Sequence, residues 1–306
     1  MALQRVKRRL KAATIADRLA TGMFYAAGIL LIVLFIAFVG YLLSKGMSRL
    51  NLQFITTAPK FMEEGGGIGP QLFNSFYLLI LSLMVSVPLG IGAGVYLAEY
   101  AKPSRLTDAI RMSLDTLSSL PSIVIGLFGL LVFVNYLGWG FSLASGAMAL
   151  LVINLPVITR VSEQAISSIP GSIKEGSLAL GATHWQTIVR VVLPAALPGI
   201  LSGVILMSGR IFGEAAALLY TAGMSSPPVD YTNWNPLHFN SPLNPFRPAE
   251  TLAVYIWKVN SEGLLPDVTE VGNGASAVLL LTVLAFNILA RSLGRFIQKK
   301  TSGATH

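Results

Sequence analysis

Residues 162–193 read SEQAISSIPGSIKEGSLALGATHWQTIVRVVL, a polar segment between two long apolar runs. The segment is too polar to cross a bilayer. Its apolar residues nevertheless recur mostly every three or four positions, which is typical of amphipathic helices. The pattern predicts two short helices that break at Gly181 and form an exposed knob suited to a groove of another protein. The apolar positions are Ile173, Leu178, Leu180, Trp185, Ile188, Val189 and Val192.

The rest of the chain has the composition of a polytopic membrane protein. It is 53% hydrophobic and 12% charged, with a mean hydropathy of +0.66, which fits a soluble protein badly. Apolar windows of 18 or more residues recur, each long enough to cross a hydrocarbon core of roughly 30 Å. We therefore expect an all-α membrane protein with six transmembrane helices, at 21–43, 71–98, 115–137, 141–159, 195–222 and 274–291.

The distribution of Lys and Arg orients these helices. Placing both termini in the cytoplasm puts sixteen of the 22 basic residues inside and five outside, and leaves Arg210 within a span. Because cytoplasmic loops carry an excess of basic residues, this orientation is favoured. The net charge of +8 is then a topology signal, and nothing further indicates nucleic-acid binding. The predicted organisation is a basic cytoplasmic amino terminus (1–20), the first transmembrane helix (21–43), an external loop (44–70), a helical core (71–222) that includes the cytoplasmic loop 162–193, a second external loop (223–273), and the sixth span with a basic cytoplasmic tail (274–306).

Several classes of protein are not favoured by the residues present. The chain has no cysteine, and its three histidines are scattered, so we predict no disulfide and no metal site. No phosphate-binding loop or hydrolase motif occurs, so we expect neither an enzyme nor a cofactor bound by this chain. The basic amino terminus precedes about 22 apolar residues without an evident cleavage site, which favours a retained first span over a signal peptide.

The second external loop, 223–273, is acidic and rich in proline. Its segment TLAVYIWKV (251–259) contains two aromatic residues and is predicted to lie as a short amphipathic helix at the outer interface. Two interpretations remain open: the loop covers the membrane surface, or it is a docking surface for an external partner.

The stretch SGRIFGEAAALLY (208–220) places Arg210 and Glu214 in the fifth span. An ionised side chain at mid-bilayer costs about 2.5–3.5 kcal/mol on insertion scales, so neither should face lipid. Four residues apart, the two lie on one helical face and are expected to form a salt bridge. The pair either fixes the register of this helix or presents Arg210 to an anion. Close helix packing is predicted at two small-xxx-small pairs, Gly199 with Gly203 and Gly209 with Gly213.

Glu175, Gly181 and the Leu193-Pro194 pair are spaced as in the cytoplasmic "EAA" loop of bacterial ABC importer permeases, which this segment resembles, although Gly176-Ser177 replace two alanines. Segments 155–170, 177–194 and 209–223, together with 74–101 and 115–134, resemble the PstA-type permease of the bacterial phosphate ABC importer. The resemblance covers most of the chain from about residue 71 to 223. It implies a type I importer permease bundle in the bacterial inner (cytoplasmic) membrane. The resemblance also assigns contacts with the ATPase subunit to the loop residues Glu175, Gly181, Ala182, Trp185, Leu193 and Pro194.

The resemblance further implies a set of partners and a path for phosphate. The partners are a second permease subunit of the related PstC type, two cytoplasmic ATPase subunits that use ATP and Mg, and an external phosphate-binding protein. Arg210, Glu214 and Arg160 are expected along the pathway. If Arg160 is a second basic station near the exit, Glu163 either forms a local pair with it or faces the ATPase; the other interpretation of Arg160 is an ordinary topology-setting cation. Three alternatives stay open: an ion-coupled secondary anion transporter, an ABC permease for another oxyanion, and pairing of two copies of this chain.

Overall fold

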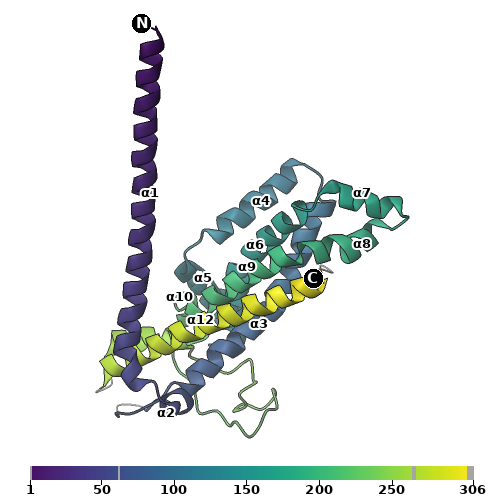
Figure 1. The fold of residues 1–306 in the computed structure, drawn as a ribbon. Helices are drawn as coiled ribbons and strands as arrows, with labels where there is room; N and C mark the ends of the chain where they lie inside the picture. The colour runs from purple at the N-terminus through teal and green to yellow at the C-terminus, as the bar shows by residue number, and fades with distance from the viewer. Residues whose placement is uncertain (1, 61–62, 264–266, 302–306) are drawn as a thin grey trace.

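The computed structural model describes residues 2–60, 63–263 and 267–301, and within these ranges the regular structure is entirely helical (Figure 1). The predicted all-α fold class is therefore confirmed. The helices are α1 (Ala2–Gly46), α2 (Leu52–Thr56), α3 (Gly69–Val95), α4 (Arg105–Ser118), α5 (Ser122–Gly129), α6 (Leu143–Ser167), α7 (Gly171–Ala179), α8 (His184–Thr187), α9 (Leu193–Gly213), α10 (Ala216–Leu219), α11 (Leu252–Glu262) and α12 (Val268–Thr301). Tyr96–Tyr100, Leu130–Tyr136 and Ile188–Val192 are π-helical segments, and Met47–Arg49 is a 3₁₀ turn.

Five helical segments are long and apolar enough to cross a membrane, and a bent pair makes a sixth if it counts as one span. The number agrees with the six predicted spans. The five segments are Ala16–Arg49, Gly69–Tyr100, Leu143–Ser167, His184–Gly213 and Val268–Phe296.

The third predicted span, 115–137, is not one helix, so that prediction is wrong. It covers the end of α4 and the whole of α5, and the segments Arg105–Ser118 and Ser122–Tyr136 meet at 97°. Pro121 explains the bend, because proline lacks a backbone N–H and disfavours helical dihedrals in the residue before it. Pro121 itself is extended, at φ −59° and ψ 135°, immediately before α5.

The fifth predicted span, 195–222, is also wrong at both ends. The helix starts earlier, at His184, and continues through the π-helical turn into α9, which ends at Gly213. Glu214 has the extended dihedrals φ −74° and ψ 120°, and α10 follows as a separate short helix. The fourth span likewise runs past its predicted end at residue 159 and reaches Ser167.

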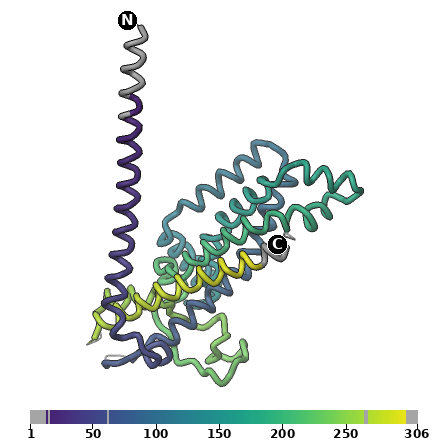
Figure 2. The backbone as a smooth tube through the Cα atoms, viewed as in Figure 1, coloured from purple at the N-terminus to yellow at the C-terminus, as the bar shows by residue number. Residues whose placement is uncertain are grey.

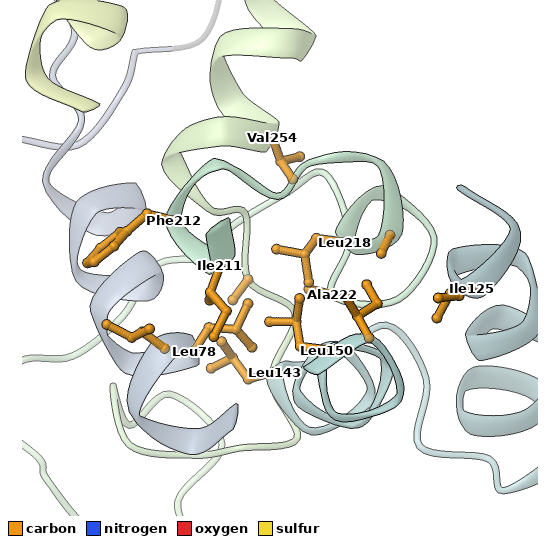
Figure 3. Close-up of a cluster of buried hydrophobic side chains, with 13 residues drawn as sticks. Leu78, Ile125, Leu143, Leu150, Ile211, Phe212, Leu218, Ala222 and Val254 are labelled. Atoms are coloured by element: carbon orange, nitrogen blue, oxygen red, sulfur yellow. The ribbon is translucent and has the colours of Figure 1, made fainter. Parts of the chain in front are cut away.

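The centre of the bundle is an apolar cluster contributed by several helices (Figure 3). In Figure 1, α3, α6, α9 and α12 run alongside one another, with α7 and α8 at one end. Without a hydrophobic driving force between helices in lipid, such a bundle is held by close packing and polar contacts. Figure 3 labels the cluster residues Leu78, Ile125, Leu143, Leu150, Ile211, Phe212, Leu218, Ala222 and Val254.

The first helix stands apart from this bundle. In Figure 2, the carboxyl end of α1 contacts α12, and the rest of α1 projects away from the bundle. The apolar window of Ala16–Arg49 is 0% buried. Arg49, just past α1, donates hydrogen bonds to Asp267 at 2.6 Å and Glu270 at 2.8 Å. The attachment of α1 thus lies where the first external loop begins.

The described part of the predicted second external loop, 223–263, lies at the opposite end of the bundle from α7 and α8 (Figure 2). It contains the predicted short helix, now α11, and one side of this helix is buried in the protein. Leu252 and Val254 are fully buried, and α11 packs on α12 and α3. The apolar side of α11 therefore belongs to the protein interior.

The four glycines of α9 differ in their surroundings. A Cβ at Gly199 would lie 2.9 Å from Ala165 Cβ, and one at Gly203 would lie 2.4 Å from Val161 Cγ1, both on α6. A Cβ at Gly209 would lie 3.3 Å from Asn287 on α12, whereas one at Gly213 has no neighbour within 4 Å. Close approach of helices thus requires glycine at 199 and 203.

We expect Gly203→Ala to lower the thermal unfolding temperature of the purified protein. The new methyl group overlaps the whole isopropyl group of Val161, and overpacking of this kind costs about 1–3 kcal/mol. Gly213→Ala is the matched control, because it adds the same methyl group in open space. Equal unfolding temperatures for the two variants would contradict the close α6–α9 contact.

Candidate functional site

The polar segment 162–193 forms the predicted helix pair at one end of the bundle (Figure 1). Gly181 separates α7 from α8 with φ +87°, a left-handed conformation that favours glycine. Thr183 then caps α8: its side chain accepts a hydrogen bond from Gln186 N, and the Gln186 side chain accepts one from Thr183 N. The sequence prediction of two short helices broken at Gly181 is confirmed.

The tip of this hairpin presents apolar side chains without cover. Leu180 is 91% exposed and Trp185 is 61% exposed. Of the other residues predicted to contact an ATPase, Glu175 and Pro194 are exposed, while Ala182 and Leu193 are half-buried. Exposed apolar patches on this scale mark surfaces that another molecule covers.

Three contacts hold the hairpin to the π-helical segment Tyr96–Tyr100 that follows α3. Lys174 donates to Glu99 at 2.5 Å, and His184 lies 3.8 Å from the same carboxylate. The rings of His184 and Tyr100 meet edge to face at 5.1 Å. The hairpin is thus coupled to α3 by side chains and to α9 directly, because His184–Gly213 is a continuous helical segment.

Four charged residues form a network between α4 and α6. Glu163 is buried and accepts from Arg111 Nε at 2.7 Å and from Arg160 Nη1 at 2.9 Å. Arg160 also donates to both carboxylate oxygens of Asp115, at 2.9 and 3.0 Å. Two arginines and two carboxylates thereby neutralise one another. They also hold α4 against α6.

The predicted position of Arg160 needs correction. It was expected just past the end of the fourth span, but α6 continues to Ser167, so Arg160 lies within the helix. Its expected pairing with Glu163 is present. Sequence reasoning missed Asp115, because a straight third span would carry it away from α6, and it missed Arg111, which precedes the predicted third span.

Arg210 and Glu214 do not form the predicted salt bridge. The prediction required one continuous helix, and α9 ends between the two residues, at Gly213. Glu214 Oε1 accepts from Ala217 N at 3.2 Å and so caps α10. Arg210 is exposed next to the buried Ile211 and has no hydrogen bond or ion pair to any residue that the structure describes.

Arg210 is therefore a cation without a compensating carboxylate on an uncovered face of a spanning helix. Because an unpaired arginine facing hydrocarbon is costly, the Arg210 side chain belongs against protein or a polar passage.

A second polar cluster, not anticipated from sequence, ties the external loop to α3. Arg247 is 1% exposed and donates to Asn74 Oδ1 at 2.7 Å and to Pro242 O at 3.0 Å. Glu250 accepts from Gln71 Nε2 at 3.0 Å and lies 3.2 Å from Lys258 Nζ. Burial lowers the pKa of Arg247 and raises the pKa of Glu250. The contacts of this cluster account for the fixed path of the loop.

This chain belongs to a family of membrane transport proteins. Residues 86–303 match the family of the binding-protein-dependent transport system inner membrane component. The match includes the α4–α6 network, the α7–α8 hairpin and Arg210. The protein is thus an integral membrane protein and an ABC importer permease subunit.

Two named permeases are similar to this chain over most of its length. The chain is 53% identical over 94% of its length, and 97% of the relative's, to the probable ABC transporter permease protein YqgI of Bacillus subtilis. It is 32% identical to the phosphate transport system permease protein PstA of Haemophilus influenzae, over 82% of this chain and 83% of the relative.

Solved structures of ABC transporters share the fold. A bacterial alginate ABC transporter, in complex with an alginate-bound periplasmic protein, aligns with a TM-score of 0.61 at 17% identity, covering 90% of this chain and 95% of its own. The MetNI methionine ABC transporter in an inward-facing conformation aligns with a TM-score of 0.54 at 19% identity, covering 76% of this chain and 94% of its own. Both support the helical arrangement described above.

Removing the shared carboxylate of the network should release α4. In Glu163→Gln, Arg111 and Arg160 lose their common anion, which leaves two partly buried guanidinium groups without that carboxylate. We expect faster hydrogen–deuterium exchange in 105–118 than in the wild type, and unchanged exchange in α11, measured by mass spectrometry.

Asp108→Asn is the control for that experiment, because it removes a carboxylate from α4 itself. Asp108 is 75% exposed and lies 3.8 Å from Arg111, so its loss should change exchange little. Equal acceleration in both variants would show that α4 is not held by Glu163.

Proposed function

We propose that this permease subunit forms half of a translocation pathway for inorganic phosphate. The observation that carries the proposal is Arg210, an exposed cation without a described partner on a membrane-spanning helix. Relatives named as phosphate transport system permeases support the choice of substrate. The chemistry also fits, because the planar guanidinium offers several donors to a tetrahedral oxyanion.

A single exposed arginine suits the passage of an anion better than its tight binding. A pathway has to release its substrate, so weak attraction at Arg210 is sufficient, and selectivity is better placed in an external binding protein. Arg160 is proposed as a second basic station, which becomes available only when Asp115 or Glu163 releases it. Glu214 lies at the adjoining helix end, where its carboxylate limits how tightly an anion is held.

The partners we propose follow from the exposed surfaces. Two ATPase subunits, which use ATP and Mg, receive the α7–α8 hairpins of this chain and of a second permease subunit. That second subunit is a related chain of the PstC type, and it covers the Arg210 side chain. A phosphate-binding protein delivers the ion from outside, in a bacterial inner membrane with both termini of this chain in the cytoplasm.

Coupling to ATP runs along a short mechanical route. When the ATPase subunits close on ATP, their grooves move the hairpin around Leu180 and Trp185. The continuous helical segment His184–Gly213 carries that movement to Arg210, and Glu99 carries it to α3. The bundle then opens outward and admits phosphate, and hydrolysis resets it.

Two other functions make different predictions. An ion-coupled secondary carrier would take up phosphate in proton-loaded vesicles that lack ATP, whereas the proposed importer requires ATP. A permease for another oxyanion would require ATP but would prefer that anion over phosphate in competition.

Arg210→Gln should reduce ATP-dependent uptake of radiolabelled phosphate by the complete transporter in proteoliposomes about tenfold. Loss of one charged hydrogen-bonding partner costs about 1.5–3 kcal/mol of interaction free energy. Because about 1.4 kcal/mol corresponds to a factor of ten, the lower end of this range already gives the expected reduction. Arg210→Lys, which keeps the charge but not the planar donors, should retain an intermediate rate.

Arg105→Gln is the matched control, since it removes an exposed arginine at the start of α4. Its uptake should equal that of the wild type. Copurification of the ATPase with each variant checks assembly. Wild-type uptake by assembled Arg210→Gln would exclude a role for Arg210 in the pathway.

Leu180→Glu should abolish copurification of the ATPase without unfolding the permease. The side chain is almost fully exposed in the free chain, so a charge there is tolerated until an apolar partner groove must accept it. Leu237→Glu, at a residue 92% exposed in the external loop, introduces the same charge elsewhere and should retain the ATPase. Normal copurification with Leu180→Glu would remove the hairpin tip from the interface.

A further inference from the structure

A groove with a volume of about 380 Å³ lies between α9 and α12. It is distinct from the α4–α6 network and from the α7–α8 hairpin. In Figure 1 the carboxyl-terminal part of α12 points toward the end of the bundle that carries α7 and α8. The residues that line the groove are Leu201, Ser202, Ile205 and Leu206 of α9 and Arg291, Gly294 and Arg295 of α12.

The polar part of the groove consists mainly of two arginines one helical turn apart. Arg291 and Arg295 are both exposed, and neither forms a hydrogen bond or ion pair with any residue that the structure describes. Gly294 lies between them, and a Cβ there would meet Ile205 Cδ1 at 3.9 Å, an ordinary contact distance. Two adjacent guanidinium groups beside a groove suit an anionic group with several acceptor oxygens.

The remaining walls are apolar. They are formed by Leu201, Ile205 and Leu206 of α9, and Leu206 is 62% exposed. A small inorganic ion gains nothing from such walls, whereas a molecule with a hydrocarbon chain buries them favourably. The groove thus has the chemistry of a site for an anionic amphiphile.

The position along α12 agrees with that chemistry. The two arginines lie at the basic end of the helix, and the sequence continues to Lys299 and Lys300. In the predicted orientation this end faces the cytoplasmic leaflet, where anionic lipids concentrate and where basic pockets between helices bind their head groups. A cation that served only to set topology would need no hollow between two helices.

We propose that the α9–α12 groove binds an anionic phospholipid of the cytoplasmic leaflet. Arg291 and Arg295 hold its phosphate group, and an acyl chain lies along Leu201, Ile205 and Leu206. A zwitterionic lipid is disfavoured, because its own cation would meet two arginines.

Binding can be measured on the assembled transporter in detergent by native mass spectrometry, with phosphatidylglycerol, phosphatidylcholine and inorganic phosphate as separate probes. We expect the first phosphatidylglycerol to bind at least about tenfold more tightly than phosphatidylcholine, and Arg291→Gln/Arg295→Gln to remove that preference. Lys102→Gln/Arg105→Gln is the matched control; it removes two exposed charges outside the groove and should retain the preference.

Gly294→Leu gives a second measurement that leaves both charges in place. Its Cβ meets Ile205 at an ordinary contact distance, and the rest of the side chain fills the groove, so phosphatidylglycerol binding should also weaken. This variant tests the proposal even if the double arginine variant fails to assemble.

Three results would overturn the proposal. They are equal binding of the two lipids, retention of the lipid preference by an assembled groove variant, and displacement of phosphatidylglycerol by millimolar inorganic phosphate. The last result would assign the groove to a free anion. None of them bears on Arg210, because ATP-dependent phosphate uptake is measured separately.

Discussion

The structure depends on the cost of placing unpaired charge in hydrocarbon. Glu163 reduces that cost for two arginines at once, because its buried carboxylate accepts from both Arg111 and Arg160. Asp115 completes the charge balance from α4. The network also fixes the position of a helix that would otherwise leave the bundle, since α4 meets the following helix at 97°. The same ion pairs therefore neutralise the charges and hold α4 in place.

Helix breaks determine which charges can meet. Pro121 turns α4 away from α5 and thereby brings Asp115 to Arg160, whereas the end of α9 at Gly213 separates Arg210 from Glu214. In the first case a break creates an ion pair, and in the second it prevents one. Arg210 consequently stays exposed, and its side chain has to be covered by a partner subunit or a polar passage.

Much of the architecture could be predicted from the sequence, because it depends on local patterns. The apolar runs predicted six helical spans, five of which correspond to single long helical segments in the structure, and the helical period with Gly181 predicted the α7–α8 hairpin. The candidate site was less predictable. The Arg160–Glu163 pair lies within one helix and was expected, but Asp115 and Arg111 required the direction of α4. The cluster around Arg247 and Asn74 joins residues 173 positions apart and leaves no local signal.

The sequence by itself determined the membrane-spanning class, the hairpin and the positions of the charged residues, because hydropathy, helical periodicity and glycine act over a few residues. Only the tertiary structure decided which charges are neutralised and which surfaces stay open. Pairing depends on how helices cross, and crossing depends on breaks whose angles no short sequence pattern specifies. The same physical reason explains why Arg160 has carboxylate partners while Arg210, Arg291 and Arg295 have none among the residues that the structure describes.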